Sequence, residues 1–533
     1  MQTIHQLIQR LSENEIELVR KYLTCFSSHN VEESAKTLKL FKYLLKQKAV
    51  PSASDCCIHV YGTLSKKDAF AMLKSRLKNK IADALNTFMN EETKEALDEV
   101  DYAAMVIDKK SAQYRQFFYS KPGLDITRNL LEETISLGKK YELYDKLITS
   151  LKFKKFRYTH KQGEEAYDAL SSEIELYEKC NRASSKANDY YYRLIFMQSQ
   201  KGKEDAAKIQ KHLSGAIKEL EKLYDQTKSN TVNYFLKNLE LVNQLNNKDY
   251  LQARRVCLEF TQIIHSYPSV YRKLRIGIAY DYFSRCELYL GHYDSAAENA
   301  QLAQKQFSPE SDNYSVAKAQ EFFALFYAGK YNEAEAVAQS MLSISRNELG
   351  EWRYAQFTYL HACALFKLGK FEEVFSILSR QLEISKDKSG WELSLRVLRI
   401  MALIEMEQLK QASAEILSLK TFVMRLQKET SITKRDRKIL AWLLNLEQNG
   451  YVFEKMNGQT EESLFLLSSD KPDYTLKLLT PELIPFHEWA NSKMKPVGNL
   501  PSRSDDQLGE SNGLKKGVKV LAKKIRHVSP YWN

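Results

Sequence analysis

The sequence has little glycine and little proline. Its 533 residues include 18 glycines and 10 prolines, about 5% together against an average of about 12%. Because these residues form turns and interrupt helices, their scarcity argues against a turn-rich β architecture and favours long helices. The chain is not poor in aromatic residues, since it has 31 tyrosines and 24 phenylalanines. Such a composition excludes a disordered chain.

The sequence also lacks the signatures of catalysis and of metal binding. It contains no phosphate-binding loop and no dinucleotide fingerprint. Residues 509–513 match the G-x-S-x-G string, but they lie in a polar stretch without the strand that this motif requires. Cys56, Cys57 and His59 form the tightest Cys/His cluster, and adjacent cysteines do not readily share one tetrahedral zinc. We therefore predict no enzyme activity, no cofactor and no metal.

Targeting and membrane-spanning segments are missing as well. No apolar run approaches the roughly 18 residues of a membrane span, and the N-terminus has no apolar signal-peptide core. The seven cysteines are scattered and form no C-x-x-C pair, which is typical of free thiols in a reducing compartment. These features predict a cytoplasmic location and no transmembrane segment.

What the sequence does contain is a repeat. Residues 289–296, 327–334 and 367–374 share the pattern Gly-x-aromatic-x-x-Ala/Val, with glycines spaced by 38 and then 40 residues. Degenerate copies lie at 247–253 and 407–412. In each copy the glycine permits the positive φ that closes a first helix, the aromatic fills the turn, and the small residue begins the buried face of a second helix. Neither helix buries its apolar stripe alone, so neighbouring pairs must stack.

This pattern resembles the tetratricopeptide repeat (TPR) over about residues 230–425. The resemblance implies an all-α, right-handed α-solenoid of antiparallel helix pairs. The period of 38–43 residues exceeds the usual 34 of the family, and the proline that often ends a repeat is mostly missing. Residues 124–228 are predicted to form further helical pairs, with candidate turns or degenerate repeat motifs at 137–141 and 161–166, around Gly138 and Gly163.

The chain is predicted to have four parts. Residues 1–110 form an N-terminal helical module, and residues 111–456 form the repeat array, which ends in a capping helix over 431–456. Residues 457–513 are an irregular segment and linker that contain prolines and glycines. Residues 514–533 form a basic tail.

The family resemblance also implies a binding groove, because ligand peptides of TPR proteins lie against the first helix of each pair. The positions carried over by register are Asp281, Arg285, Tyr289, Phe323, Tyr327, Tyr359 and Lys367. A groove of aromatic and charged residues suits an extended peptide or a partner helix. The predicted function is a cytoplasmic scaffold or adaptor that binds a protein or peptide partner there. The alternative interpretation of these residues is packing between repeats.

The net charge of +12 is concentrated in two segments. Residues 36–80 carry a net charge of +9 and residues 514–533 carry +6, so the rest of the chain is slightly acidic. Helices are predicted over 4–23, 31–46, 54–61 and 66–85. The cations that lie away from the apolar stripe of the last helix form a candidate patch for nucleic acid or an acidic partner, and they are Lys67, Lys74, Arg76, Lys78 and Lys80.

This order of helices resembles a winged helix, although no β-hairpin is evident after Leu85. It supports an alternative function, a TPR-containing regulator whose N-terminal module binds nucleic acid. A solvated face of lysines is the simpler interpretation. For the tail, we favour disorder over a helix that contacts a membrane surface or a partner.

Overall fold

The computed structural model describes residues 1–25, 31–87, 94–95, 97–159, 163–199, 206–379, 388–429, 432–456, 458–469, 471, 473–476 and 478–494. All regular secondary structure in these residues is helical, which confirms the predicted all-α class. Two compact units can be described separately. Unit 1 is Met1–Lys330, and unit 2 begins at Tyr331. The linker at 498–513 and the tail at 514–533 lie outside the described residues.

Unit 1 begins with helices that share one hydrophobic core. They are α1 (Gln2–Gln9), α2 (Glu13–Cys25), α3 (Val31–Lys46), α4 (Ala53–Tyr61) and α5 (Lys67–Thr87). The prediction of a single helix over 4–23 is therefore wrong, because α1 ends at Gln9 and a second helix begins after Ser12. The Ser12 hydroxyl accepts a hydrogen bond from the Glu15 amide (3.2 Å), and the Glu15 carboxylate accepts one from the Ser12 amide (2.8 Å). This reciprocal capping box starts a new helix.

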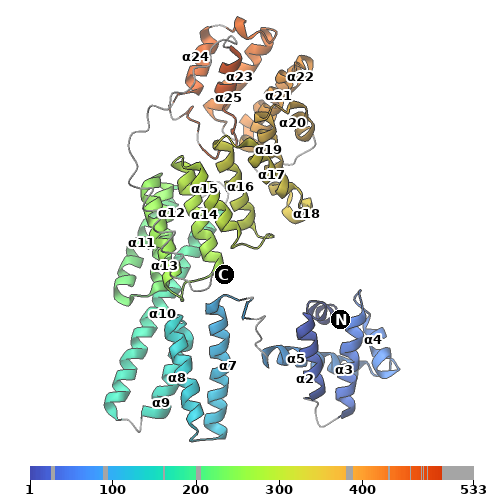
Figure 1. The fold of residues 1–533 in the computed structure, drawn as a ribbon, viewed down its shortest axis with the longest axis vertical. Helices are drawn as coiled ribbons and strands as arrows, with labels where there is room; N and C mark the ends of the chain where they lie inside the picture. The colour runs from blue at the N-terminus through green and yellow to red at the C-terminus, as the bar shows by residue number, and fades with distance from the viewer. Residues whose placement is uncertain are drawn as a thin grey trace. The chain divides into compact units, whose positions relative to one another are not determined.

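The remainder of unit 1 consists of helices that pack against their neighbours in sequence order. They are α7 (Glu99–Ser120), α8 (Asp125–Lys140), α9 (Tyr144–Tyr158), α10 (Glu164–Ser199), α11 (Ala206–Thr227), α12 (Asn230–Asn246), α13 (Tyr250–Ser266), α14 (Lys273–Tyr289), α15 (Tyr293–Gln304) and α16 (Asp312–Tyr327). Figure 1 shows α7, α8 and α9 side by side. Such stacking of consecutive helices is the α-solenoid that the repeat pattern predicts. The handedness of its superhelix stays a prediction.

The turns between paired helices repeat one backbone geometry. Gly291, Gly329 and Gly369 all have positive φ, between 74° and 79°. One residue after each glycine, the backbone N–H bonds to a carbonyl five residues back, as in His292 N to Glu287 O at 2.9 Å. This is the Schellman arrangement, which satisfies the last carbonyls of a helix. The three glycines of the repeat pattern thus close their helices as predicted.

The same turn occurs at residues that are not glycine. Glu142, Lys248 and Glu407 have φ of 50°, 61° and 56°, and the residue after each makes the equivalent hydrogen bond. The candidate turn around residues 137–141 therefore lies slightly later, with its positive φ at Glu142 and not at Gly138. Gly138 is buried inside α8, where a Cβ would lie 2.9 Å from the Cβ of Leu147. Glycine is needed there because α8 and α9 approach closely.

The aromatic residues of the repeat pattern join successive pairs. Tyr250, the first residue of α13, stacks on Tyr289 at the end of α14, with ring centroids 4.3 Å apart and ring planes at 5°. Tyr293 stacks in the same way on Tyr327, at 5.9 Å. These two anchors therefore pack on the first helix of the next pair, whereas Phe371 of α20 lies against Phe366 of α19, the first helix of its own pair.

Unit 2 continues with helical pairs and ends in a compact terminal structure. Its elements are α17 (Tyr331–Leu342), α18 (Arg346–Leu349), α19 (Glu351–Lys367), α20 (Phe371–Leu378), η2 (Lys388–Glu392), α21 (Leu393–Glu405), α22 (Leu409–Glu429), α23 (Lys434–Gln448), η3 (Phe453–Lys455), α24 (Gly458–Leu467) and α25 (Phe486–Met494). Trp442 of α23 is buried against Phe486 and Trp489 of α25. The apolar face predicted for the capping helix is thus covered by the residues that follow it.

The predicted end of the N-terminal module, residue 110, lies within α7. The boundaries of the four predicted parts stay predictions. Among the helices of the described segments, none combines the length and the apolar character needed to cross a membrane.

Candidate partner-binding surface

Two of the predicted groove residues form a polar cluster on α14. The carboxylate of Asp281 lies 3.4 Å from the guanidinium of Arg285, one helical turn later. Its other neighbour is Gln320 of α16, whose Nε2 donates a hydrogen bond to Asp281 Oδ1 at 2.7 Å. Burial raises the pKa of Asp281, and the two partners offset part of that increase. The pair is held in place by two adjacent helices of unit 1.

Tyrosines from three helices surround this cluster. Tyr191 of α10 lies against Phe235 of α12, with ring centroids 5.5 Å apart. Burial is the largest cause of the raised pKa of Tyr282 on α14, and the neighbouring Tyr191, Asp281 and Tyr234 raise it further. Arg285 lies 5.7 Å from the centroid of the Tyr282 ring. These interactions place the side chains of α10, α12 and α14 on one surface.

Arg275 of α14 completes the surface. Its guanidinium lies 4.2 Å from the ring centroid of Tyr234 and 5.8 Å from that of Phe235. It donates a hydrogen bond to the Val270 carbonyl at 3.3 Å. It forms no ion pair with any carboxylate that the structure describes, and burial lowers its pKa. This half-buried cation is thus held by aromatic faces and one backbone carbonyl.

We call Tyr191, Arg275, Tyr282 and Arg285, together with Tyr234, which is only 3% exposed and lies in the core beside Arg275, the tyrosine–arginine surface. Burial also raises the pKa of Tyr191 and of Tyr234, so all three phenols stay protonated at neutral pH and act as hydrogen-bond donors. Together with the guanidinium groups they offer donors and positive charge to an anion. The neighbouring Tyr192 ring is 61% exposed and provides an aromatic contact at the edge. This chemistry suits binding rather than bond cleavage.

The other predicted groove residues of unit 1 lie between helices. Tyr289 and Tyr327 are the tyrosines on which the aromatic anchors of the preceding pairs stack. For these two residues the contacts match the packing interpretation. Phe323 of α16 is buried, and its ring lies 6.0 Å from that of Phe322 on the same helix.

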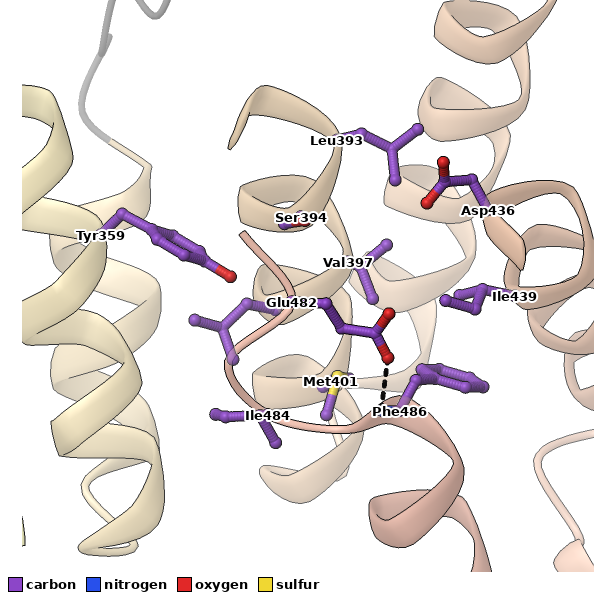
Figure 2. Close-up of a pocket in the computed structure, with 11 residues that line it drawn as sticks. Tyr359, Leu393, Ser394, Val397, Met401, Asp436, Ile439, Glu482, Ile484 and Phe486 are labelled. Atoms are coloured by element: carbon purple, nitrogen blue, oxygen red, sulfur yellow. Dashed lines mark hydrogen bonds between the residues drawn. The ribbon is translucent and has the colours of Figure 1, made fainter. Parts of the chain in front are cut away.

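In unit 2 the predicted groove position Tyr359 is covered by the chain itself. Its hydroxyl donates a hydrogen bond to the Pro481 carbonyl at 2.6 Å, and the residue is only 2% exposed. Figure 2 shows Glu482, Ile484 and Phe486 lying beside α21 in the same region. The small cavity that these residues line has about 20 Å³ of free space, enough for one water molecule and too little for a substrate. The last predicted groove residue, Lys367, is half-exposed at the end of α19. It lies near Cys363, whose pKa is raised to about 12, mainly by burial, and the charge of Lys367 offsets part of that increase.

The cations predicted to form a patch lie on two flanks of α5. Because successive residues of a helix are about 100° apart, Lys67, Lys74 and Lys78 fall on one flank. Arg76 and Lys80 fall on the other. Lys67 and Lys78 are exposed, and the other three are half-buried. The structure therefore separates these residues into two groups.

The Cys/His cluster does not assemble a metal site. Cys56 and Cys57 are buried in the N-terminal core, while His59 stacks on Tyr43 with ring centroids 4.1 Å apart. Over the whole described part of the chain, no three His, Cys, Asp or Glu residues gather in a way that suits a metal ion.

Comparisons with known proteins give little further guidance. No family model matches the chain, and no curated protein matches it. The solved structures that match include a Signal Transduction ATPase with Numerous Domains (STAND) protein with a tetratricopeptide repeat sensor from Pyrococcus horikoshii. The match is 12% identical and covers 80% of this chain and 66%, just under two thirds, of that chain, with a TM-score of 0.36. The helical-pair architecture rests on the chain's own helices.

The sequence reasoning missed Tyr191, Tyr234, Arg275 and Tyr282. One signal was available, because Arg275, Tyr282 and Arg285 are seven and then three residues apart and so share a helix face. The approach of α10 and α12 to that face leaves no mark in the local sequence. Only the packed structure brings Tyr191 and Tyr234 to Arg275.

Proposed function

We propose that this chain is a cytoplasmic scaffold of TPR-like helical pairs that binds an acidic segment of a protein partner on the tyrosine–arginine surface. The observation that supports this proposal is the Arg275 guanidinium, which forms no ion pair with a carboxylate in the described part of the chain. A cation removed from water is costly unless an anion compensates it. A carboxylate of the partner supplies that anion, and the phenols of Tyr191 and Tyr282, both half-buried, donate hydrogen bonds to it.

The chemistry of the surface favours binding over catalysis. The neighbouring carboxylate of Asp281 already interacts with Arg285 and Gln320. Aromatic residues and arginine are the residue types that most often dominate binding energy at protein interfaces. The cytoplasmic assignment is supported by the cysteines, all of which are free thiols.

The test is selection of a random peptide library displayed on phage against the intact chain. We expect the enriched peptides to be rich in Asp and Glu. Replacement of Arg275 by Met should weaken the best peptide by about 30-fold or more, since breaking a buried charge pair costs at least about 2 kcal/mol.

The matched control is Arg255→Met, which removes an exposed arginine from α13 of the same unit. This variant should bind as the unmodified chain does. Enrichment of neutral or basic peptides, or equal affinities for the Arg275 and Arg255 variants, would contradict the proposal.

A further inference from the structure

Helix α5 of the N-terminal module has three distinct faces. One face, with Phe70, Leu73, Leu77 and Ile81, is at most 5% exposed and packs into the core that α2 and α3 share. The opposite face carries Asp68, Met72, Ser75 and Asn79, all exposed. The cations lie between these two faces, on both flanks of the helix.

The outward face carries no cation over these three turns, from Asp68 to Asn79. Its side chains are a carboxylate, a thioether, a hydroxyl and an amide. These groups recognise base edges in duplex DNA, where Asn reads adenine, Asp accepts from cytosine, Ser contacts several bases, and apolar atoms contact the thymine methyl. A face built only for solubility needs no such separation, because lysines on the outermost positions serve that purpose equally well.

The flanks match the walls of a DNA groove. Lys67, Lys74 and Lys78 lie on one flank and form no ion pair with any residue described in the structure, and Arg76 and Lys80 lie on the other. An α-helix with its side chains is about 10–12 Å across and the major groove is about 12 Å wide. A helix in that groove has a phosphate backbone on each side, so cations on both flanks reach phosphates at once.

The elements before α5 hold it as the second helix of a helix–turn–helix. The short α4 ends at Gly62, whose φ is 74° and whose N–H bonds to Ile58 O at 2.7 Å. A turn over 62–66 leads into α5, and the Tyr61 hydroxyl donates to the Ala69 carbonyl at 3.3 Å. Cys56, Cys57 and Val60 of α4 are buried in the same core as Phe70 and Leu73 of α5. This support fixes α5 and leaves its outward face open.

We propose that the N-terminal module binds duplex DNA with α5 in the major groove, a function separate from the protein-binding surface of the repeats. The outward residues Asp68, Met72, Ser75 and Asn79 contact base edges, and the cations of both flanks contact phosphates. Placement on two flanks is what distinguishes this binding from attraction to an acidic protein, which meets a helix from one side.

The experiment is fluorescence anisotropy of a labelled random-sequence duplex over a salt series, with the full chain. The basic tail is neutralised in every protein used, so that its charges do not bind DNA. The tail residues replaced by glutamine are Lys515, Lys516, Lys519, Lys523, Lys524 and Arg526. Two α5 variants are compared, Lys74→Gln/Lys78→Gln for one flank and Arg76→Gln/Lys80→Gln for the other. The matched control, Lys39→Gln/Lys42→Gln, removes two exposed charges from α3 of the same module.

We expect duplex binding that weakens steeply with salt. Each α5 variant should lower the affinity and reduce the salt slope by about 2, as for two lost phosphate contacts, and the α3 control should change neither. No duplex binding, an effect confined to one flank, or an equal loss in the α3 control would overturn the proposal. Circular dichroism of each variant verifies that the helices remain.

A second measurement tests the outward face. The full chain selects duplexes from a random library, and the selection is repeated with Ser75→Ala/Asn79→Ala. We expect an enriched sequence for the unmodified chain and a relaxed one for the variant, with similar random-duplex affinity for both proteins. The same enriched sequence for both, or preferential binding of single strands, would contradict major-groove recognition by α5.

Discussion

The hydroxyl of Ser229 donates a hydrogen bond to the carboxylate of Glu142, 87 residues earlier in the chain, at 2.9 Å. The same carboxylate accepts hydrogen bonds from the backbone amides of Asn230 and Thr231, at 2.8 and 2.9 Å. Glu142 is the residue of positive φ in the turn between α8 and α9. A strained turn thus satisfies the first amides of α12, which have no partner within their own helix.

We expect Glu142→Gln to lower the unfolding free energy of unit 1 by about 1–3 kcal/mol, because hydrogen bonds to a charged acceptor are stronger than those to an amide. Denaturant unfolding monitored by circular dichroism measures the change. Asp145→Asn is the matched control, since Asp145 is exposed in the first turn of α9. That variant should cost no more than about 0.5 kcal/mol, from the helix dipole alone. Equal losses in the two variants would show that the contact with α12 adds no stability.

The non-glycine turn at Lys248 predicts a stabilising substitution. A side chain at φ of 61° costs about 1–2 kcal/mol, and glycine avoids this cost while losing about 0.5–1 kcal/mol in chain entropy. Lys248→Gly should therefore raise the thermal midpoint, whereas Lys248→Ala should not.

Gly291 allows the opposite substitution, from glycine to a residue with a side chain, at an equivalent turn. No atom lies within 4 Å of a Cβ built there, so Gly291→Ala should lower stability by about 1–2 kcal/mol through backbone strain alone. A lower midpoint for Lys248→Gly than for Lys248→Ala would refute the assignment of strain to this turn.

Arg435 of α23 connects three segments near the end of unit 2 by hydrogen bonds. Its guanidinium binds both carboxylate oxygens of Glu482, at 2.6 and 2.7 Å, and the carbonyls of Leu467 and Tyr474. Arg435→Met should destabilise unit 2 by about 3–5 kcal/mol, because Glu482 is left buried without its partner. Arg435→Met/Glu482→Leu should recover part of this loss.

Tryptophan fluorescence measures this change selectively, since every tryptophan of the sequence follows Tyr331. The control is Arg437→Met, an exposed arginine two residues later. If the double variant is no more stable than Arg435→Met, the unpaired carboxylate is not the cause of the loss.

A half-buried histidine, His265 of α13, gives unit 1 a pH dependence. Burial lowers the pKa of His265 from its ordinary value of 6.5. The unfolded chain therefore binds a proton at a higher pH than the folded chain does. Stability from this residue is fully present above pH 6.5 and is lost as the pH falls from there toward the lower folded pKa.

Thermal midpoints at pH 7.5 and pH 5 measure this dependence. We expect His265→Phe, which keeps a ring beside Tyr271 and cannot take up a proton, to lose less stability on acidification than the unmodified chain. Equal losses at pH 5 would remove His265 as a source of the pH dependence.

Local sequence was sufficient to predict the helical pairs. Gly291, Gly329 and Gly369 mark turns because glycine adopts positive φ without a steric cost, and the apolar stripe of α5 is readable because i, i+3 and i+4 positions share a helix face. The break at Ser12 was also readable from its capping box, although the helix prediction passed over it. These features depend only on residues within a few positions of each other.

The sequence was less informative where a turn has no glycine. The residue types at Glu142 and Lys248 do not indicate positive φ. The turn was therefore predicted around Gly138, and this glycine instead permits close packing of α8 and α9. The same limit applied to the groove. Register alone pointed to Tyr289 and Tyr359, but Tyr289 stacks on Tyr250 and Tyr359 lies under Pro481.

The amino-acid sequence by itself determined that this protein is a stack of helical pairs with its positive charge gathered in the N-terminal module and the tail. The tertiary structure decided which side chains meet, such as Arg275 with Tyr234 and Glu142 with Ser229. The physical reason is that helix periodicity acts over a few residues. Contacts between pairs depend instead on how each helix is rotated and offset against its neighbours, which is set by the packing of all their side chains together.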